Sequence, residues 1–342
     1  MSAPSWTNEP HAPIYIDPQA KGAERRTHPR SVVAVDAACD LPADYLARNA
    51  IVVLPMRVLG PAHDALDHRN ALDTERFIRG PLTQQGDRFS VRSMGMRETQ
   101  KFLLSSIDAN RDNVFQLTSS AASTPVFSTC AHAATGLMAL HKRAREGTGY
   151  RTKFRMWVLD TRTMFAGEGV LAYAAVKQLS AGANSGRLVD HLQIVRHATH
   201  TVVVPTNGRG LEDEFDEPEE KPFFTRWLAA LRSAHVPQHL LLTREGRTHS
   251  LGQRATHREA LETVIRIAGQ ALDSGLLVPV VNLSYAGDVA EIETRSDFQY
   301  LVERARIRKI DVLLSNMSVV GTSNMGAGSV SLGFAPRRPF SN

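Results

Sequence analysis

Five hydroxyl side chains gather within seven residues of the sequence, after a short apolar run at residues 114–117 and before a long stretch of small and apolar residues. They are Thr118, Ser119, Ser120, Ser123 and Thr124. The pattern predicts a buried strand, a polar turn and the start of a helix. Hydroxyl groups and the unpaired N–H groups of a helix start can together bind an anionic head group. We call residues 118–124 the hydroxyl turn.

Other polar residues stand in comparable positions. Asp36 ends the apolar run at residues 31–36, and Asp160 ends the run at residues 156–160. In an open α/β sheet, ligands bind at the carboxyl ends of the strands, so both carboxylates are candidates for a site. Each aspartate also has an alternative interpretation as a capping or turn residue. Ser93 precedes another predicted helix and offers a further hydroxyl.

Alternating strands and helices must position these residues. The run at residues 31–36, a helix that starts at Asp40-Leu41-Pro42 and a second apolar run at residues 51–58 have the spacing of a βαβ unit. A helix at residues 125–145 follows the hydroxyl turn, and another starts near Gly167. These units predict a Rossmann-like, doubly wound parallel sheet.

After residue 198 the regular alternation ends. A helix at residues 256–272 keeps clear helical spacing, and strands at residues 276–283 and 310–314 flank further helical sequence. We expect a second α/β domain with a mixed or antiparallel sheet. The predicted division is an N-terminal extension outside the core (1–30), a first domain (31–198) and a second domain (199–342), with a solvated acidic loop at 212–220 and an amphipathic helix at 223–231.

Composition excludes several classes of function. The chain has 342 residues, of which 42% are hydrophobic and 22% charged, as in soluble globular proteins. Its net charge of +5 comes from basic residues scattered among acidic ones, which argues against nucleic-acid binding. We expect no membrane span and no signal peptide, because no apolar run is long enough. Cys39 and Cys130 are expected to be buried thiols in a reducing cytoplasm.

Catalytic and metal chemistry are weaker interpretations. Ser123, His132 and Asp160 have the residue types of a hydrolase triad, but the G-x-S-x-G elbow is absent and His132 is expected in the core of a helix. His197 and His200 form an H-x-x-H without a third ligand nearby, so we expect no metal site. The glycine-rich segment near Gly326 lacks the lysine of a phosphate-binding loop. A serine-dependent acyl hydrolase remains an alternative function.

The order of the motifs resembles the DegV family of bacterial fatty-acid-binding proteins. VAVDAACDLP and IVVLPMRV match the family's first two strands, and Arg92-Ser93-Met94-Gly95 stands where members have T-S-Q-P. The hydroxyl turn matches S-S-x-L-S-G-T, VLDTRTMFAGEG matches the next strand end, and Asn324-Met325-Gly326-Ala327-Gly328 matches H-x-G-P-G.

This resemblance implies a two-domain, non-enzymatic lipid carrier that buries a long-chain fatty acid between its domains. It also implies a partner, an ATP-binding fatty-acid kinase subunit to which the carrier presents the carboxylate. Ser93 and Ser123 become the head-group ligands, and no cofactor or catalytic residue is implied. The full set of implied ligand-binding residues is Ser93, Ser123, Ser119, Arg92, Thr124, Arg254 and Asn324.

The chain departs from the family pattern within these motifs. Ala37 replaces a serine, Arg92 replaces the threonine of T-S-Q-P, and Pro125 removes a backbone donor at the end of S-G-T. Asn324 stands in place of a histidine and carries no positive charge. A diverged family member that acts as an interaction protein is therefore a further alternative.

Overall fold

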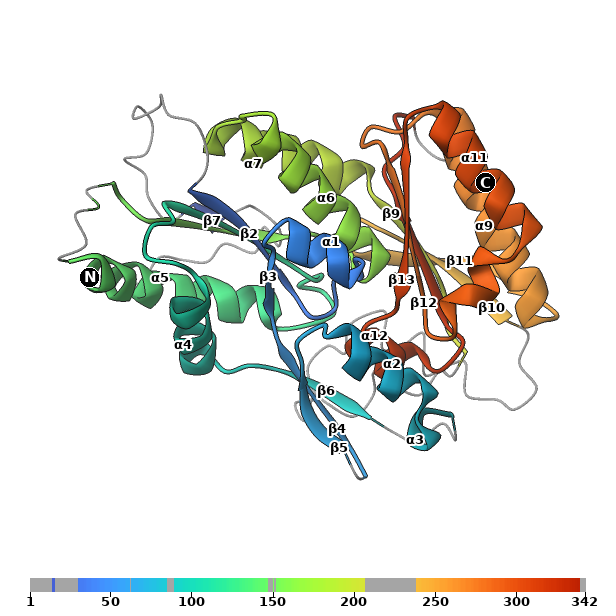
Figure 1. Cartoon of the computed structure of the whole chain (residues 1–342), viewed down its shortest axis with the longest axis horizontal. Helices are drawn as coiled ribbons and strands as arrows, with labels where there is room; N and C mark the ends of the chain where they lie inside the picture. Colours follow the sequence, from blue (N-terminus) through green and yellow to red (C-terminus); the bar gives the residue numbers. More distant parts are fainter. Residues whose placement is uncertain are drawn as a thin grey trace.

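The computed structural model describes residues 14–15, 30–61, 63–84, 89–146, 150, 152–206 and 238–338. Within these ranges the chain forms three sheets with helices packed on them, and helix α6 lies between the two larger sheets (Figure 1). The predicted acidic loop and the predicted helix at 223–231 lie outside the described residues. The same holds for residues 1–13 and 16–29 of the predicted extension.

The first sheet has the predicted Rossmann-like body. Its strands run in the order β1-β8-β7-β2-β3, parallel except for β1 at the edge. The bounds are β1 (Ile14–Tyr15), β2 (Ser31–Asp36), β3 (Val52–Leu54), β7 (Asn113–Thr118) and β8 (Arg155–Asp160). Strand β1 was not expected, because it belongs to the segment predicted to lie outside the core. From β2 the chain adds β3 on one side, and from β7 it adds β8 on the other, so the carboxyl ends of β2 and β7 form the topological switch point of the sheet.

Helices cover both faces of this sheet (Figure 1). They are α4 (Met96–Ser106) and α5 (Val126–Arg145) on one face, and α6 (Ala166–Ser180) and α7 (Ser185–Ala198) on the other, with α1 (Ala43–Arg48) between β2 and β3. The predicted helix at residues 125–145 is confirmed almost to the residue. Helix α7 was not predicted; it begins at Asn184, whose side chain accepts a hydrogen bond from the Arg187 N–H group.

A small antiparallel sheet projects below the first one and is a correction to the sequence prediction. The apolar run at residues 51–58 was expected to form one strand, but it breaks at Pro55, which has no N–H group to donate to a sheet. The residues after Pro55 form β4 (Met56–Gly60), which pairs with β5 (His63–Asp67) and β6 (Ser90–Ser93). Helices α2 (Ala71–Arg79), α3 (Pro81–Gln84) and α12 (Val319–Met325) complete this region (Figure 1).

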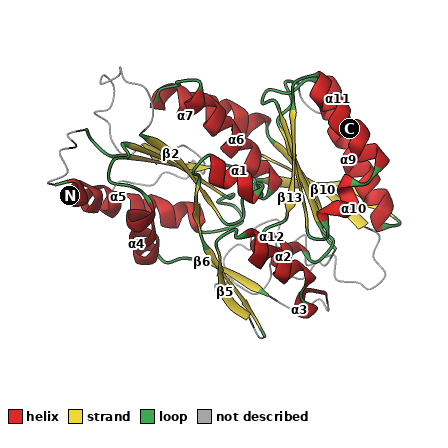
Figure 2. Cartoon of the chain, in the orientation of Figure 1, coloured by secondary structure: helices red, strands yellow, loops and turns green. Residues whose placement is uncertain are grey.

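The second large sheet has six strands in the order β11-β10-β9-β14-β12-β13. All neighbours are antiparallel except β12 and β13, so the predicted mixed sheet is confirmed. The bounds are β9 (His200–Val204), β10 (Gln238–Arg244), β11 (Arg247–Arg254), β12 (Val280–Tyr285), β13 (Asp311–Asn316) and β14 (Val330–Phe334). Helices α9 (His257–Ser274), α10 (Val289–Glu293) and α11 (Ser296–Ile307) cover its outer face (Figure 2).

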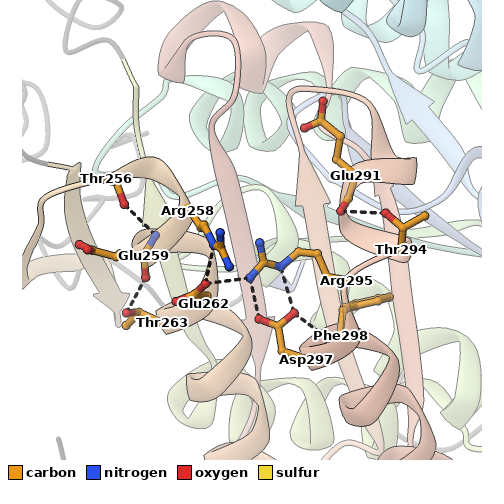
Figure 3. A network of polar contacts seen from close by, with 10 residues as sticks. All are labelled: Thr256, Arg258, Glu259, Glu262, Thr263, Glu291, Thr294, Arg295, Asp297 and Phe298. Atoms are coloured by element: carbon orange, nitrogen blue, oxygen red, sulfur yellow. Dashed lines mark hydrogen bonds and ion pairs between the residues drawn. The ribbon is translucent and has the colours of Figure 1, made fainter.

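A polar network joins the start of α9 to the start of α11 (Figure 3). The Arg295 guanidinium donates to both carboxylate oxygens of Asp297, at 2.9 and 2.7 Å, and reaches Glu262 of α9 at 3.6 Å. Arg258 donates to Glu262 from one turn earlier, and the Thr256 hydroxyl caps the helix by accepting from the Glu259 N–H group. Exposed ion pairs contribute little individually, so the network mainly fixes where the two helices start relative to each other.

Helix α6 joins the two larger sheets. It packs on β2 and β7 of the first sheet and on β12 and β14 of the second. An apolar surface all the way round is typical of a helix buried on every side. Its start lies so close to β14 that a Cβ atom on Gly333 would overlap the backbone of Ala166 and Gly167. The absence of a side chain at Gly333 therefore permits this close packing.

Candidate functional site

The hydroxyl turn lies at the switch point of the first sheet, between the end of β7 and the start of α5. Its backbone is fixed by two hydrogen bonds, in which the N–H groups of Ser123 and Thr124 both donate to the Ser120 carbonyl at 2.9 and 3.0 Å. Proline at position 125 leaves α5 without a side-chain cap. The site therefore combines a helix start with several hydroxyl groups, which is the arrangement that the sequence predicted.

Asp36 lies directly beside this turn because β2 and β7 are neighbours. Its Oδ2 accepts hydrogen bonds from the Ser119 N–H group at 2.7 Å and from the Ser119 hydroxyl at 2.8 Å. Its Oδ1 accepts from the Ala38 N–H group at 2.9 Å. The side chain is fully buried, and burial raises the pKa of Asp36 while these hydrogen bonds act in the opposite direction.

The hydroxyl of Thr124 continues this arrangement toward the surface. Its Oγ1 lies 3.1 Å from the Ser119 Oγ. Asp36 and Ser119 have no exposed surface, whereas Thr124 is partly exposed. Asp36, Ser119 and Thr124 thus form a hydrogen-bonded series that runs from the interior outward, and we call it the hydroxyl relay.

The second domain closes over the other side of the turn. A cavity of about 10 Å³, the size of one water molecule, lies between them. Its lining consists of Ser120, Ser123, Met164 and Phe165 from the first domain and Thr201, Val203, Thr243, Gly246 and Thr248 from the second. The β10–β11 hairpin reaches this point through Gly246, which has a φ of +74° and donates its N–H to the Arg162 carbonyl at 2.8 Å.

The other implied ligands lie in different places. Ser93 ends β6 opposite Met56 and is partly buried, while Arg92 is exposed opposite Arg57. Asn324 lies in the last turn of α12 with 7% of its surface exposed, and its Oδ1 has no hydrogen-bond partner among the described residues. Helix α12 packs against β6, so Asn324 and Ser93 lie on neighbouring elements.

The structure does not bring Arg254 to the hydroxyl turn. Its Nε donates to the Thr263 hydroxyl at 2.8 Å, and its Nη1 donates to the Gln253 carbonyl at 2.7 Å. Arg254 ends β11, whereas Gly246, in the hairpin turn just before the start of this strand, meets the hydroxyl turn. The length of an eight-residue strand, about 26 Å, separates the two ends.

Two buried carboxyl groups near the site were not predicted as functional residues. Asp40, expected only to start a helix, accepts hydrogen bonds from the Ser284 hydroxyl at 2.6 Å and the Ser318 N–H group at 2.8 Å. Both partners belong to the second domain. Glu168 of α6 is fully buried, with one oxygen 3.4 Å from the Asp36 N–H group and the other without a partner among the described residues. A glutamate inside the otherwise apolar start of α6 was the signal that could have identified it.

Burial raises the pKa of Glu168 well above its ordinary value, and the negative charge of Asp36 adds to the increase. We therefore expect the folded protein to keep a proton on Glu168 that the unfolded chain releases near the ordinary value of 4.5. We expect the free energy of unfolding to fall as pH rises above that value. Glu168→Gln should remove this contribution, so its stability relative to wild type should rise by about 1.4 kcal/mol per pH unit.

Urea unfolding of both proteins at pH 5.5 and pH 7.5 measures this difference. Glu293→Gln, on the exposed face of α10, is the matched control and should show no comparable change with pH. If the difference in free energy of unfolding between wild type and Glu168→Gln is the same at both pH values, Glu168 is ionised in the folded protein.

Comparison with known proteins identifies the family. The family model described as an uncharacterised protein of the DegV family matches residues 31–212. The chain belongs to the DegV family. Among its relatives, the DegV domain-containing proteins of Xanthomonas campestris pv. campestris and Xanthomonas axonopodis pv. citri are each 26% identical to it, over 89% of this chain and 96% of theirs.

Three solved structures of other proteins share its fold. A stearic acid-binding protein from Eubacterium ventriosum superposes with a TM-score of 0.69 at 13% identity, over 89% of this chain and 98% of that one. A DegV lipid-binding protein from Thermotoga maritima gives 0.65 at 15% identity, and the fatty acid kinase B3 protein of Streptococcus pneumoniae, loaded with linoleic acid, gives 0.65 at 10%. Each of these two covers 90% of this chain and 99% of its own.

The hydrolase interpretation finds little support in this DegV-family chain. Asp160 accepts hydrogen bonds from the N–H groups of Ala121 and Arg162, as a turn residue does. His132 is exposed on α5, which corrects the expectation of a core histidine.

The described part of the chain offers no group of three or more histidine, cysteine or carboxylate side chains that could hold a metal ion. His197 instead lies 3.2 Å from Glu245, and His200 lies 2.8 Å from the Ala198 carbonyl. Among the described helices, none combines the length and the apolar character needed to cross a membrane. Both Cys39 and Cys130 are buried free thiols.

Proposed function

We propose that this DegV-family protein binds a long-chain fatty acid between its two domains, with the carboxylate at the hydroxyl turn. The observation that carries the proposal is the contact of this turn with an apolar cluster to which both domains contribute. Met164, Phe165 and Val203 line the small cavity beside Ser123 and also belong to that cluster. Known relatives of the same fold, such as the Eubacterium ventriosum protein, are described as binding fatty acids.

The alkyl chain would enter this cluster by displacing side chains. The cavity of about 10 Å³ is too small for it, so Met164 and Met325 would have to change rotamer. Methionine suits such a rearrangement because its side chain is flexible and polarisable. Each buried methylene contributes about 0.8 kcal/mol, so a chain of sixteen carbons can offset the reorganisation.

For the head group, we propose a direct hydrogen bond from the Ser123 hydroxyl, with Ser93 and the side chain of Asn324 completing the polar surface. In this arrangement Thr124, the outer hydroxyl of the hydroxyl relay, faces the head group, and Ser119 supports it from behind. Arg92 precedes Ser93 in β6 and is exposed. We assign Arg254 to the packing of β11 on α9, because its hydrogen bonds point there.

The wider assignments follow from the same proposal. We propose that residues 31–198 form the head-group domain and residues 199–342 the covering domain, since the strands of the two large sheets fall on opposite sides of that division. The protein would act in the cytoplasm, where both of its thiols stay reduced, and would carry the fatty acid to an ATP-binding kinase subunit without catalysing a reaction alone.

Protein purified from a bacterial host should release fatty acids of about 14–18 carbons on denaturing extraction, as detected by mass spectrometry. Added hexadecanoic acid should raise the melting temperature, because a ligand that binds only the folded state stabilises it. Ser123→Ala should weaken binding about 10- to 100-fold, the usual effect of losing a hydrogen bond to a charged group.

Ser128→Ala is the matched control, because Ser128 is an exposed serine one turn further along α5 whose hydroxyl donates to the Pro125 carbonyl. Its affinity should equal that of wild type. Absence of lipid in several preparations, together with an unchanged melting temperature, would contradict the proposal and favour a diverged interaction protein. Hydrolysis of p-nitrophenyl esters that is lost in Ser123→Ala would instead indicate a hydrolase.

A further inference from the structure

The direction of the hydrogen bonds in the hydroxyl relay follows from the number of protons available. A serine hydroxyl has one proton to donate, and a carboxylate can only accept. The Ser119 Oγ lies 2.8 Å from Asp36 Oδ2 and gives its proton there. The 3.1 Å contact between Ser119 and Thr124 must then be donated by Thr124. Both hydroxyl protons therefore point inward, toward Asp36.

This direction determines what the relay presents to a ligand. Thr124 is the outermost member of the relay and is partly exposed. Its hydroxyl proton is already donated to the Ser119 oxygen. Toward a head group it offers lone pairs alone. An ionised carboxylate also has only lone pairs, so the two groups repel unless a proton lies between them. That proton can sit on the ligand, or it can sit on Asp36 and reverse both hydrogen bonds of the relay.

The surroundings of Asp36 favour the uptake of a proton. Asp36 carries no exposed surface, and burial disfavours its charged form. Among the described residues, the titratable groups that interact with it are Glu168 of α6, Cys39 after β2 and Cys130 of α5. Asp40 and Asp160 add their negative charge at Glu168, and the Arg69 cation acts on Asp40 and Cys39. A second carboxylate brought to this environment adds negative charge to negative charge, and two such carboxylates hold one proton between them.

We propose that the hydroxyl relay makes head-group binding proton-linked, so that a carboxylate binds together with one proton taken from solvent, whereas a neutral head group that carries its own donor proton binds without one. The chemical class of ligand is thus a protonated fatty acid, or a long-chain alcohol or primary amide. The inference rests on the proposed function and adds the ionisation state of the ligand to it. Thr124 and Ser119 act as specificity-determining residues, with Asp36 as the proton acceptor behind them.

The affinity for hexadecanoic acid should fall about tenfold per pH unit between pH 6.5 and pH 8.5, since each binding event consumes one proton. The affinity for hexadecanol and hexadecanamide should stay constant over the same range. Titration calorimetry in phosphate and in Tris, whose ionisation enthalpies differ, should show uptake of about one proton for the acid and none for the alcohol. Equal affinity for the acid across this range, with no proton uptake, would overturn the inference.

Variants separate the relay from the pH behaviour of the fatty acid itself. In Thr124→Val the outer hydroxyl is gone, and the decrease in acid affinity with pH should be smaller than in wild type measured with the same ligand stock. Thr124→Ser restores a hydroxyl and should restore the wild-type slope, while Ser128→Ala should not alter it. An identical slope in wild type and Thr124→Val would overturn the role of the relay. Failure of the acid, the alcohol and the amide to bind at any pH would overturn the proposed function, and the proton linkage with it.

Discussion

Replacing Asp40 by alanine is expected to lower the free energy of unfolding by about 3–5 kcal/mol, as measured by urea titration followed by circular dichroism. The reason is that both oxygens of this buried carboxylate accept hydrogen bonds from the other domain. Its loss leaves the Ser318 N–H group and the Ser284 hydroxyl buried without their acceptor. The Arg69 guanidinium, which is buried and stabilises the charged form of Asp40, loses that charge as well.

Asp44 provides the matched control four residues later in the chain. It is exposed on α1, and its carboxylate lies 2.6 Å from Arg48 on the same helix. Such pairs contribute about 0–1 kcal/mol, so Asp44→Ala should change stability by no more than that. Equal effects of the two substitutions would show that Asp40 does not hold the domains together.

Gly333→Ala should destabilise the protein by about 3 kcal/mol, the upper part of the usual range for overpacking. The added methyl group would collide with the carbonyl of Ala166 and the nitrogen of Gly167. These are backbone atoms at the start of α6, and they cannot rotate away as the end of a flexible side chain can. The same unfolding titration measures the effect, and crystallography of the variant should show α6 shifted away from β14.

Gly186→Ala serves as the control for the glycine substitution. Gly186 is exposed in the first turn of α7, and a methyl group there would meet only the Asn184 side chain at an ordinary 3.7 Å. Alanine is the better helix former by about 1 kcal/mol, so this variant should be as stable as wild type or slightly more stable. If Gly333→Ala loses no more stability than Gly186→Ala, then the start of α6 can move away from the added methyl group at little cost.

The sequence predicted the elements whose pattern is local. The helices at residues 126–145 and 257–274 have recognisable starts and long regular stretches, and strands β2, β7 and β8 end in polar residues as expected. Helix α12 and strand β14 escaped prediction because their surfaces are buried on every side, which removes any alternation of polar and apolar residues. The small antiparallel sheet escaped because its strands are short and β6 pairs with residues more than thirty positions away.

The candidate site was predicted in part for the same reason. The hydroxyl turn and Asp36 could be placed at one edge of the sheet, because strand ends are visible in the sequence and parallel strands align them. The partners of Asp40 could not be predicted from the sequence, because Ser284 and Ser318 lie 244 and 278 residues further along the chain. Arg254 was assigned by the order of motifs alone, which does not tell at which end of its strand the ligand lies.

The position of β14 has a consequence for biosynthesis. This strand pairs with β9 on one side and with β12 on the other, yet it is made about 126 residues after β9. At a synthesis rate of about 5–20 residues per second, one edge of β9 waits roughly 6–25 seconds for its neighbour. An apolar strand with an open edge is prone to pair with other chains. We therefore expect the open edge of β9 to need shielding until residues 330–334 have emerged.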